Sequence, residues 1–199
     1  AYTIRNFRLG DHTKPDPISE KGLFGRIGTG GTIQDLVVKV DYMGSAVNPN
    51  NFNITKCGLI AAYNEGTIRR CSVMVNYTLY VAGEIGVIAY QNSGIIENCL
   101  SAVGASSIII SDEASAAGIA YENSGAIKNC LFDGKLRTDG VTGNSYTAKD
   151  YAIAQNSSNG TITNCYYYHS KPRVSDEIYE GELYKDGDNS TVISKTQKE

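Results

Sequence analysis

Residues 88–99 read Ile-Ala-Tyr-Gln-Asn-Ser-Gly-Ile-Ile-Glu-Asn-Cys, and residues 119–130 read Ile-Ala-Tyr-Glu-Asn-Ser-Gly-Ala-Ile-Lys-Asn-Cys. Residues 60–71 fit the same pattern without a gap, a copy at 153–165 needs one inserted residue, and a degenerate copy at 24–36 has Leu in place of Cys. The central isoleucines of these five copies are 35, 28, 31 and 35 residues apart. A period near 30, with one block of fixed length and one of variable length, predicts a solenoid in which each copy is one rung.

The residues after each Cys indicate strands. Cys71, Val73 and Val75 alternate with Ser72 and Met74, and no stretch has helical apolar spacing. We therefore predict an all-β fold, a parallel β-helix of about five rungs with about three strands per turn and irregular caps. A leucine-rich repeat would need a Leu-x-x-Leu-x-Leu frame, which is absent, and a propeller blade would need about 40–45 residues.

The chain divides into three segments. We expect an N-terminal cap or partial rung at 1–21, the solenoid at 22–170 and a polar C-terminal cap or tail at 171–199. Variable inserts occupy 44–57, 101–116 and 134–150, and we expect them to form loops on one face. Such loops are more often solvated turns, and the alternative is that they bind a partner. No signal peptide is visible, and we interpret the chain as a processed or excised piece of a longer protein.

Composition excludes several classes of protein. The 199 residues carry a net charge of -3, and 41% of them are hydrophobic. An acidic balance disfavours nucleic acid as a partner, and no apolar run is long enough to span a membrane. Two His residues, His12 and His169, leave little for a metal site or catalytic triad.

Four cysteines form one column, one rung apart: Cys71, Cys99, Cys130 and Cys165. Their Cβ vectors would be parallel, which suits a disulfide poorly, and the chain has no Cys-x-x-Cys for zinc. We interpret them, with Cys57 near an insert, as buried thiols that act as small apolar residues. Free thiols in a surface protein would suit an anaerobic host.

Two columns of amides accompany the cysteines. Asn98, Asn129 and Asn164 directly precede a Cys, with Asp35 and Arg70 at that place in the other copies, and Asn64, Asn92 and Asn123 form the second column. Stacked amides can hydrogen-bond along the ladder and satisfy backbone groups at the corners. A ligand-binding role for them is the alternative.

The sequence shows no group of residues arranged for catalysis. The carboxylates of the repeats fall in different columns, and they are Glu65, Glu97, Glu122 and Asp133. Arg69 and Arg70 lack an acidic partner in their own rung. The stretch 186–190 resembles the start of a calcium loop, but Gln197 occupies the closing position where an EF-hand needs Glu. We therefore predict no catalytic residue, no metal ligand and no cofactor, and the residues that bind a partner stay unknown.

Tyr90 and Tyr121 occupy the same place on consecutive rungs. We favour an aromatic stack that stabilises the corner, because cross-strand aromatic pairs commonly do this. The alternative is a glycan-binding face, which exposed tyrosines beside Asn and Asp would suit.

Gly22-Leu23-Phe24-Gly25 followed by Gly30-Gly31-Thr32-Ile33, and Asn159-Gly160-Thr161-Ile162 followed by Asn164-Cys165-Tyr166, resemble the GLUG-motif repeat family of bacterial surface and secreted proteins. The resemblance covers about residues 22–170, although the copies at 88–99 and 119–130 lack the Gly-Leu. It implies a β-solenoid that is extracellular or attached to the cell surface, as part of a longer chain.

These observations lead to three hypotheses about function. The first is a non-catalytic, adhesin-like repeat module that binds a glycan or host surface protein through its inserts. The second is a carbohydrate-active β-helix enzyme, such as a polysaccharide lyase or hydrolase. The third is a structural spacer without a ligand.

Overall fold

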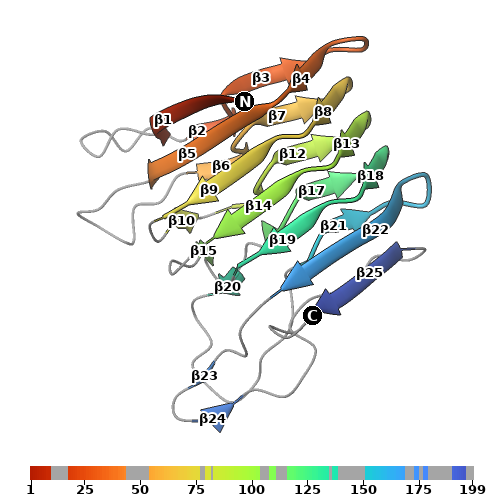
Figure 1. The fold of residues 1–199 in the computed structure, drawn as a ribbon. Helices are drawn as coiled ribbons and strands as arrows, with labels where there is room; N and C mark the ends of the chain where they lie inside the picture. Colours follow the sequence, from red (N-terminus) through yellow and green to blue (C-terminus); the bar gives the residue numbers. More distant parts are fainter. Residues whose placement is uncertain are drawn as a thin grey trace.

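The chain winds into a β-solenoid of about three turns built from parallel sheets, as Figure 1 shows. The computed structural model describes residues 1–9, 18–43, 54–76, 79–81, 83–103, 108–110, 116–134, 136–138, 151–168, 173–174, 177–178 and 190–195. The predicted fold class, an all-β parallel β-helix, is confirmed, but the count of five rungs is not.

Three successive turns each contain five short strands. The first consists of β6 (Ile54–Gly58), β7 (Ala61–Asn64), β8 (Thr67–Arg69), β9 (Ser72–Val75) and β10 (Leu79–Val81). The second consists of β11 (Ile85–Gly86), β12 (Ala89–Asn92), β13 (Ile95–Glu97), β14 (Leu100–Val103) and β15 (Ile108–Ile110). The third consists of β16 (Ala116–Ala117), β17 (Ala120–Asn123), β18 (Ala126–Lys128), β19 (Leu131–Asp133) and β20 (Leu136–Thr138). The prediction of about three strands per turn is therefore wrong for these turns, because β15 and β20 lie inside segments expected to be loops.

Further strands flank these turns at both ends. On the N-terminal side lie β1 (Tyr2–Leu9), β2 (Ile18–Lys21), β3 (Phe24–Ile27), β4 (Thr32–Gln34) and β5 (Leu36–Met43). On the C-terminal side lie β21 (Ala154–Asn156), β22 (Thr161–Tyr168), β23 (Arg173–Val174), β24 (Glu177–Ile178) and β25 (Ser190–Lys195). The first and last strands of the chain both join the stack, because β1 pairs in parallel with β5 and β25 pairs in parallel with β22.

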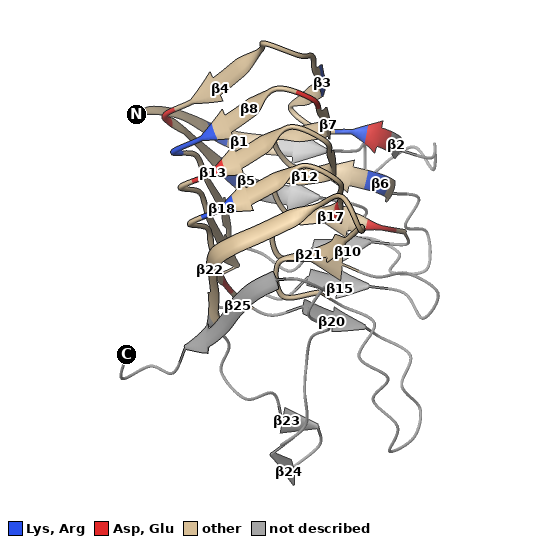
Figure 2. Ribbon diagram, turned by 90° about the vertical axis from the view of Figure 1, so that its right-hand side faces the viewer, with Lys and Arg blue, Asp and Glu red and all other residues tan. Residues whose placement is uncertain are grey.

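Equivalent strands of successive turns stack into sheets, which Figure 2 shows in a view turned by 90° from that of Figure 1. The front sheet has the order β1-β5-β9-β14-β19-β22, the middle sheet β22-β18-β13-β8-β4, and the tyrosine sheet β21-β17-β12-β7-β3. Strand β22 belongs to two sheets because its first half pairs with β18 and its second half with β19. Two smaller sheets, β16-β11-β6-β2 and β10-β15-β20, complete the turns.

The repeat sets the register of the stack. Ile33, Ile68, Ile96, Ile127 and Ile162 are direct partners from strand to strand in the middle sheet. All but Ile33 are at most 2% exposed. The predicted alternation after each Cys is also confirmed, since Val73 and Val75 are 0% exposed whereas Ser72 and Met74 are half-buried. One repeat unit therefore builds a continuous core by placing the same apolar side chain in the same slot on each turn.

The corner between the middle and front sheets explains the amide column before the cysteines. Residues at this corner have left-handed backbone angles, with φ of 56° at Asp35, 50° at Arg70, 54° at Asn98, 52° at Asn129 and 50° at Asn164. Asn and Asp adopt this conformation more readily than most residues. The corner thus selects Asn for its backbone, a requirement that the sequence pattern alone did not reveal.

Candidate functional site

A row of aromatic rings follows the tyrosine sheet. Tyr90 and Tyr121 stack with ring centroids 5.7 Å apart and an interplanar angle of 10°. Tyr63 meets Tyr90 edge-on at 6.1 Å, and Tyr151 meets Tyr121 edge-on at 6.4 Å. These four residues, Tyr63, Tyr90, Tyr121 and Tyr151, are called the tyrosine row below. The sequence predicted the shared slot of Tyr90 and Tyr121, and the stack confirms it.

One carboxylate accepts hydrogen bonds from the two central residues of the tyrosine row. The hydroxyl of Tyr90 donates to Glu84 Oε2 at 3.2 Å, and the hydroxyl of Tyr121 donates to Glu84 Oε1 at 3.3 Å. Tyr90 is 5% and Tyr121 8% exposed, so of the two interpretations from sequence the aromatic stack is confirmed for this pair and the exposed glycan-binding face is not. Burial, with smaller contributions from Glu122 and Glu84, raises the pKa of Tyr90. The pair therefore stabilises the turns as an aromatic stack and leaves no ring face open for a sugar.

The end of the row near β3 is more accessible. The Arg26 guanidinium lies 4.7 Å from the centroid of the Tyr63 ring and forms an ion pair with Glu65. Tyr63 is half-buried, and the side chains of Arg26 and Glu65 are 56% and 37% exposed. Burial, and then a hydrogen bond with Glu20, raises the pKa of Tyr63. A cation, an aromatic ring and a carboxylate thus meet where solvent reaches them.

Two polar side chains continue this surface on the following turns. Gln91 takes the place of Tyr63 in the register, and Glu122 takes it on the next turn. Gln91 Nε2 donates to Glu122 Oε2 at 3.0 Å. Together with Arg26 and Tyr63, these groups can donate and accept hydrogen bonds and offer a ring face. That is the chemistry of binding a polar ligand. The sequence pattern did not reveal Glu84 because it precedes the repeated block, and it did not reveal Arg26 because the following copies have Tyr63, Gln91 and Glu122 at that place instead of Arg.

The second amide column forms a buried ladder, as predicted. Asn64 donates to Asn92, Asn92 to Asn123 and Asn123 to Asn156, each from Nδ2 to Oδ1 at 2.7 Å. The ladder ends where Asn156 Nδ2 donates to the Gly160 carbonyl at 2.9 Å. Asn64, Asn92 and Asn123 are at most 1% exposed, so they hold the turns together and are closed to a ligand.

The cysteine column is also buried, and all five cysteines are free. Each thiol of the column donates to the carbonyl two residues before it, at 3.2 to 3.4 Å. The neighbouring thiol of Cys99, and then burial, raises the pKa of Cys71. These are core thiols, in agreement with the interpretation from sequence.

Cys57 provides a test of burial through pH. This thiol is 0% exposed, and desolvation raises its pKa from 9.0 to about 12. Between these two values the unfolded chain loses the proton and the folded chain keeps it, so the free energy of unfolding falls as pH rises, by about 1.4 kcal/mol per pH unit for this group. Urea unfolding from pH 8.5 to 10.5 should therefore show a steeper loss of stability for the native sequence than for Cys57→Ala. Parallel pH profiles would contradict this assignment.

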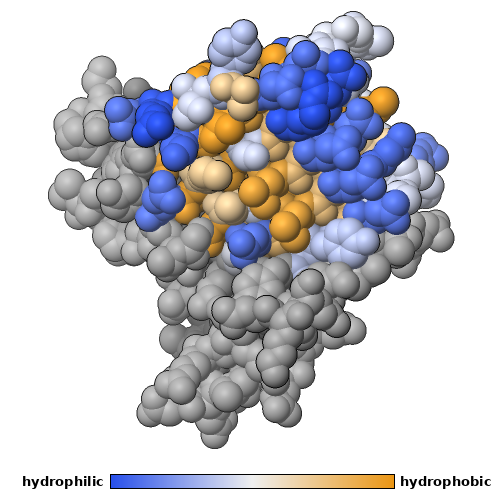
Figure 3. Space-filling view, viewed as in Figure 1, coloured by the Kyte–Doolittle hydropathy of each residue, from blue (hydrophilic) through white to orange (hydrophobic). Residues whose placement is uncertain are grey.

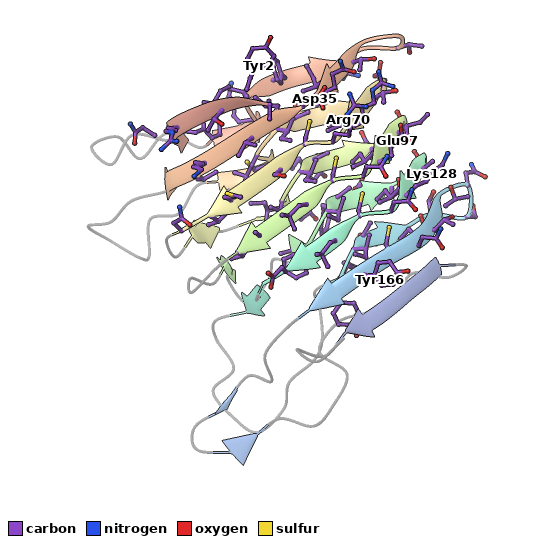
Figure 4. All side chains as sticks on the ribbon, viewed as in Figure 1. Tyr2, Asp35, Arg70, Glu97, Lys128 and Tyr166 are labelled. Atoms are coloured by element: carbon purple, nitrogen blue, oxygen red, sulfur yellow. The ribbon has the colours of Figure 1, made fainter. Side chains whose placement is uncertain are left out.

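Arg69 and Arg70 find hydrogen-bond partners on the preceding turn rather than within their own. Arg70 donates to both carboxylate oxygens of Asp35, from Nε at 2.7 Å and from Nη2 at 2.8 Å, and Figure 4 shows the two side chains at neighbouring corners. The Arg70 hydrogen bond lowers the pKa of Asp35. Arg69 donates to Gln34 at 2.6 and 2.9 Å. The structure therefore supplies the acidic partner of Arg70 that no single rung contains.

The other carboxylates named in the sequence analysis do not lie together in one site. Glu97 stands between Arg69 and Lys128 in the middle sheet, Glu65 pairs with Arg26, and Asp133 faces outward on the front sheet. Within the described parts of the chain, no group of three His, Cys, Asp or Glu side chains is arranged to hold a metal ion. His12, His169, Gln197, residues 186–189 and most of the inserts lie outside the described residues.

Comparisons with protein-family models, with curated proteins and with solved structures give no match for this chain. Among the described residues, no helix has the length and apolar character needed to cross a bilayer.

Proposed function

We propose that the chain is a non-catalytic, extracellular adhesin-like repeat module that binds a glycan or a host surface protein through its variable inserts. The supporting observation is the register of the strands that flank the inserts. Ala102, at the start of the insert at 101–116, is the direct partner of Asp133, which directly precedes the insert at 134–150. Cys57 and Ala116, the last residues of the inserts at 44–57 and 101–116, both pair with Ile85, which lies between them. The described ends of the inserts are therefore one or two strand spacings apart, about 5 to 10 Å, on a rigid stack. Closely spaced variable segments on a fixed scaffold are typical of binding surfaces.

The accessible end of the tyrosine row supports the same proposal. Phe24, Arg26 and Ile27 on β3 pair with β7, which follows β6, the strand that ends the first insert. Arg26, Tyr63, Gln91 and Glu122 then give this side of the solenoid a ring face and hydrogen-bonding groups, as glycan recognition requires. The buried state of all five thiols also suits an extracellular location, since oxidants do not reach them.

The number of rungs and the type of repeat are part of the same proposal. We infer five rungs of a GLUG-type repeat from a bacterial surface protein, as part of a longer chain. Support comes from the order β21-β17-β12-β7-β3, in which every strand comes from a different copy of the repeat.

A binding and turnover screen tests this function. The chain is applied to immobilised host glycans, host surface proteins and uronate polymers, and both retention and the release of shortened polymer are measured. We expect retention without product release, and replacement of residues 44–53 by a Gly-Ser linker of equal length should abolish it at an unchanged Tm. Glu97→Gln, on the middle sheet, is the matched control and should bind normally. Product release would favour the carbohydrate-active enzyme instead, and absence of retention would favour the structural spacer.

A further inference from the structure

The outer face of the front sheet is apolar at its centre and charged at two ends. Its outward positions form two columns. The first contains Val37, Ser72, Leu100, Leu131 and Tyr166, and the second contains Lys39, Met74, Ala102 and Asp133. Figure 3 shows the apolar surface that results, with hydrophilic residues on both sides. The alternate residues of these strands, such as Val38, Val73 and Phe132, are 0% exposed and fill the core.

The two charges of the second column have no ion-pair partner among the described residues. The described ion pairs are Arg26 with Glu65 and Arg70 with Asp35, and neither includes Lys39 or Asp133. Lys39 lies on β5 and Asp133 on β19, three strand spacings apart, with Met74 and Ala102 between them. At about 4.8 Å per strand these charges are separated by about 14 Å along the stack, which prevents them from pairing with each other.

This arrangement is complementary to itself. A two-fold axis parallel to the strands, midway between β9 and β14, places β5 of one copy over β19 of the other. Lys39 then faces Asp133 of the second copy, and Asp133 faces its Lys39. The same operation places Met74 over Ala102 and Val37 over Leu131. An interface of this kind is isologous, which is the commonest symmetry of soluble dimers.

We propose that the front sheet binds a second copy of this chain, with the two solenoids antiparallel and two reciprocal Lys39–Asp133 ion pairs enclosing an apolar centre. Two sheets that pack face to face in this way lie about 10 Å apart, a distance that a lysine side chain and a carboxylate can bridge. The apolar centre excludes water from the contact, while the ion pairs fix its register and disfavour the parallel alternative, which would bring like charges together.

Charge reversal tests this dimer directly. Sedimentation equilibrium from 10 µM to 1 mM should show a reversible dimer of the native chain. Lys39→Asp alone, or Asp133→Lys alone, places like charges opposite each other twice and should raise the dimer Kd by about tenfold or more. The double variant Lys39→Asp with Asp133→Lys restores both pairs in reversed order and should return Kd to within about threefold of the native value.

A matched exchange on another face provides the control. Glu97→Lys with Lys128→Glu alters one carboxylate and one lysine on the middle sheet, whose outward side chains Figure 4 labels. It should leave Kd unchanged, and all variants should keep the native Tm to within a few degrees. A native chain that is monomeric throughout the range, a Kd that neither single reversal alters, or a double variant that fails to recover dimerisation would each overturn the proposal.

Discussion

Replacement of Gly94 by alanine should destabilise the fold by about 4 kcal/mol, or lower the Tm by roughly 10 °C. A Cβ atom at Gly94 would lie 2.1 Å from the Gly66 carbonyl oxygen and 2.7 Å from the Glu65 carbonyl carbon. These are backbone atoms of the preceding turn, so no side chain can rotate to make room. The same carbonyl accepts from the Ile95 N–H at 2.8 Å. The extra methyl group would therefore force two turns apart at the point where they are bonded.

Gly25→Ala is the matched control for this experiment. Its added Cβ would have no atom within 4 Å. The control should change the free energy of unfolding by no more than about 0.5 kcal/mol, because the substitution mainly restricts the unfolded chain. Thermal and urea unfolding of both variants give the comparison. If Gly94→Ala and Gly25→Ala were equally stable, the close approach of Gly66, Gly94 and Gly125 on successive turns would not limit the spacing of the solenoid.

The repeat made the stacking predictable. Because Ile68, Ile96 and Ile127 recur at one place in a block of fixed length, the parallel register follows from the sequence once strands are assigned. The buried asparagine ladder follows from the same argument. Identical polar residues at identical places in a core can satisfy one another from turn to turn.

The variable blocks were harder to read. Ile108–Ile110 and Leu136–Thr138 form strands of a sheet with Leu79–Val81, although their spacing from the repeated block differs from turn to turn. A periodicity argument depends on constant spacing, so it assigned these residues to loops. Pairing of strands with different offsets is decided by tertiary packing, which a local pattern does not contain.

Partners between turns were missed for a related reason. Glu84 accepts from both Tyr90 and Tyr121, yet it precedes the repeated block and has no equivalent in the neighbouring copies. Asp35 and Arg70 were recognised as members of one column without being recognised as an ion pair. In a parallel stack the nearest residue is the one a full turn away, so contacts must be sought along columns rather than along the chain.

Replacement of Asn92 by leucine should cost about 3 kcal/mol, because it breaks the asparagine ladder at its centre. Asn92 is 0% exposed, accepts from Asn64 and donates to Asn123, each at 2.7 Å. Leucine has a similar volume but neither donates nor accepts. The amide of Asn64 and the carbonyl of Asn123 would then each lose a partner in the core, and a buried polar group left unsatisfied costs about 1–3 kcal/mol.

Two further variants separate this effect from a general loss of packing. Asn129→Gly removes an exposed amide that donates to Asn98 at 3.3 Å and accepts from Asn164 at 3.4 Å, and glycine keeps the φ of 52° there. Both contacts are long and exposed to solvent, so the substitution should cost less than about 1 kcal/mol. Asn92→Leu combined with Asn123→Leu still leaves only two broken ends, at Asn64 and Asn156. The double variant should therefore lose much less than the sum of the two single variants in urea unfolding. Additive costs would mean that the asparagines act independently, and the ladder would not then be the unit that couples one turn to the next.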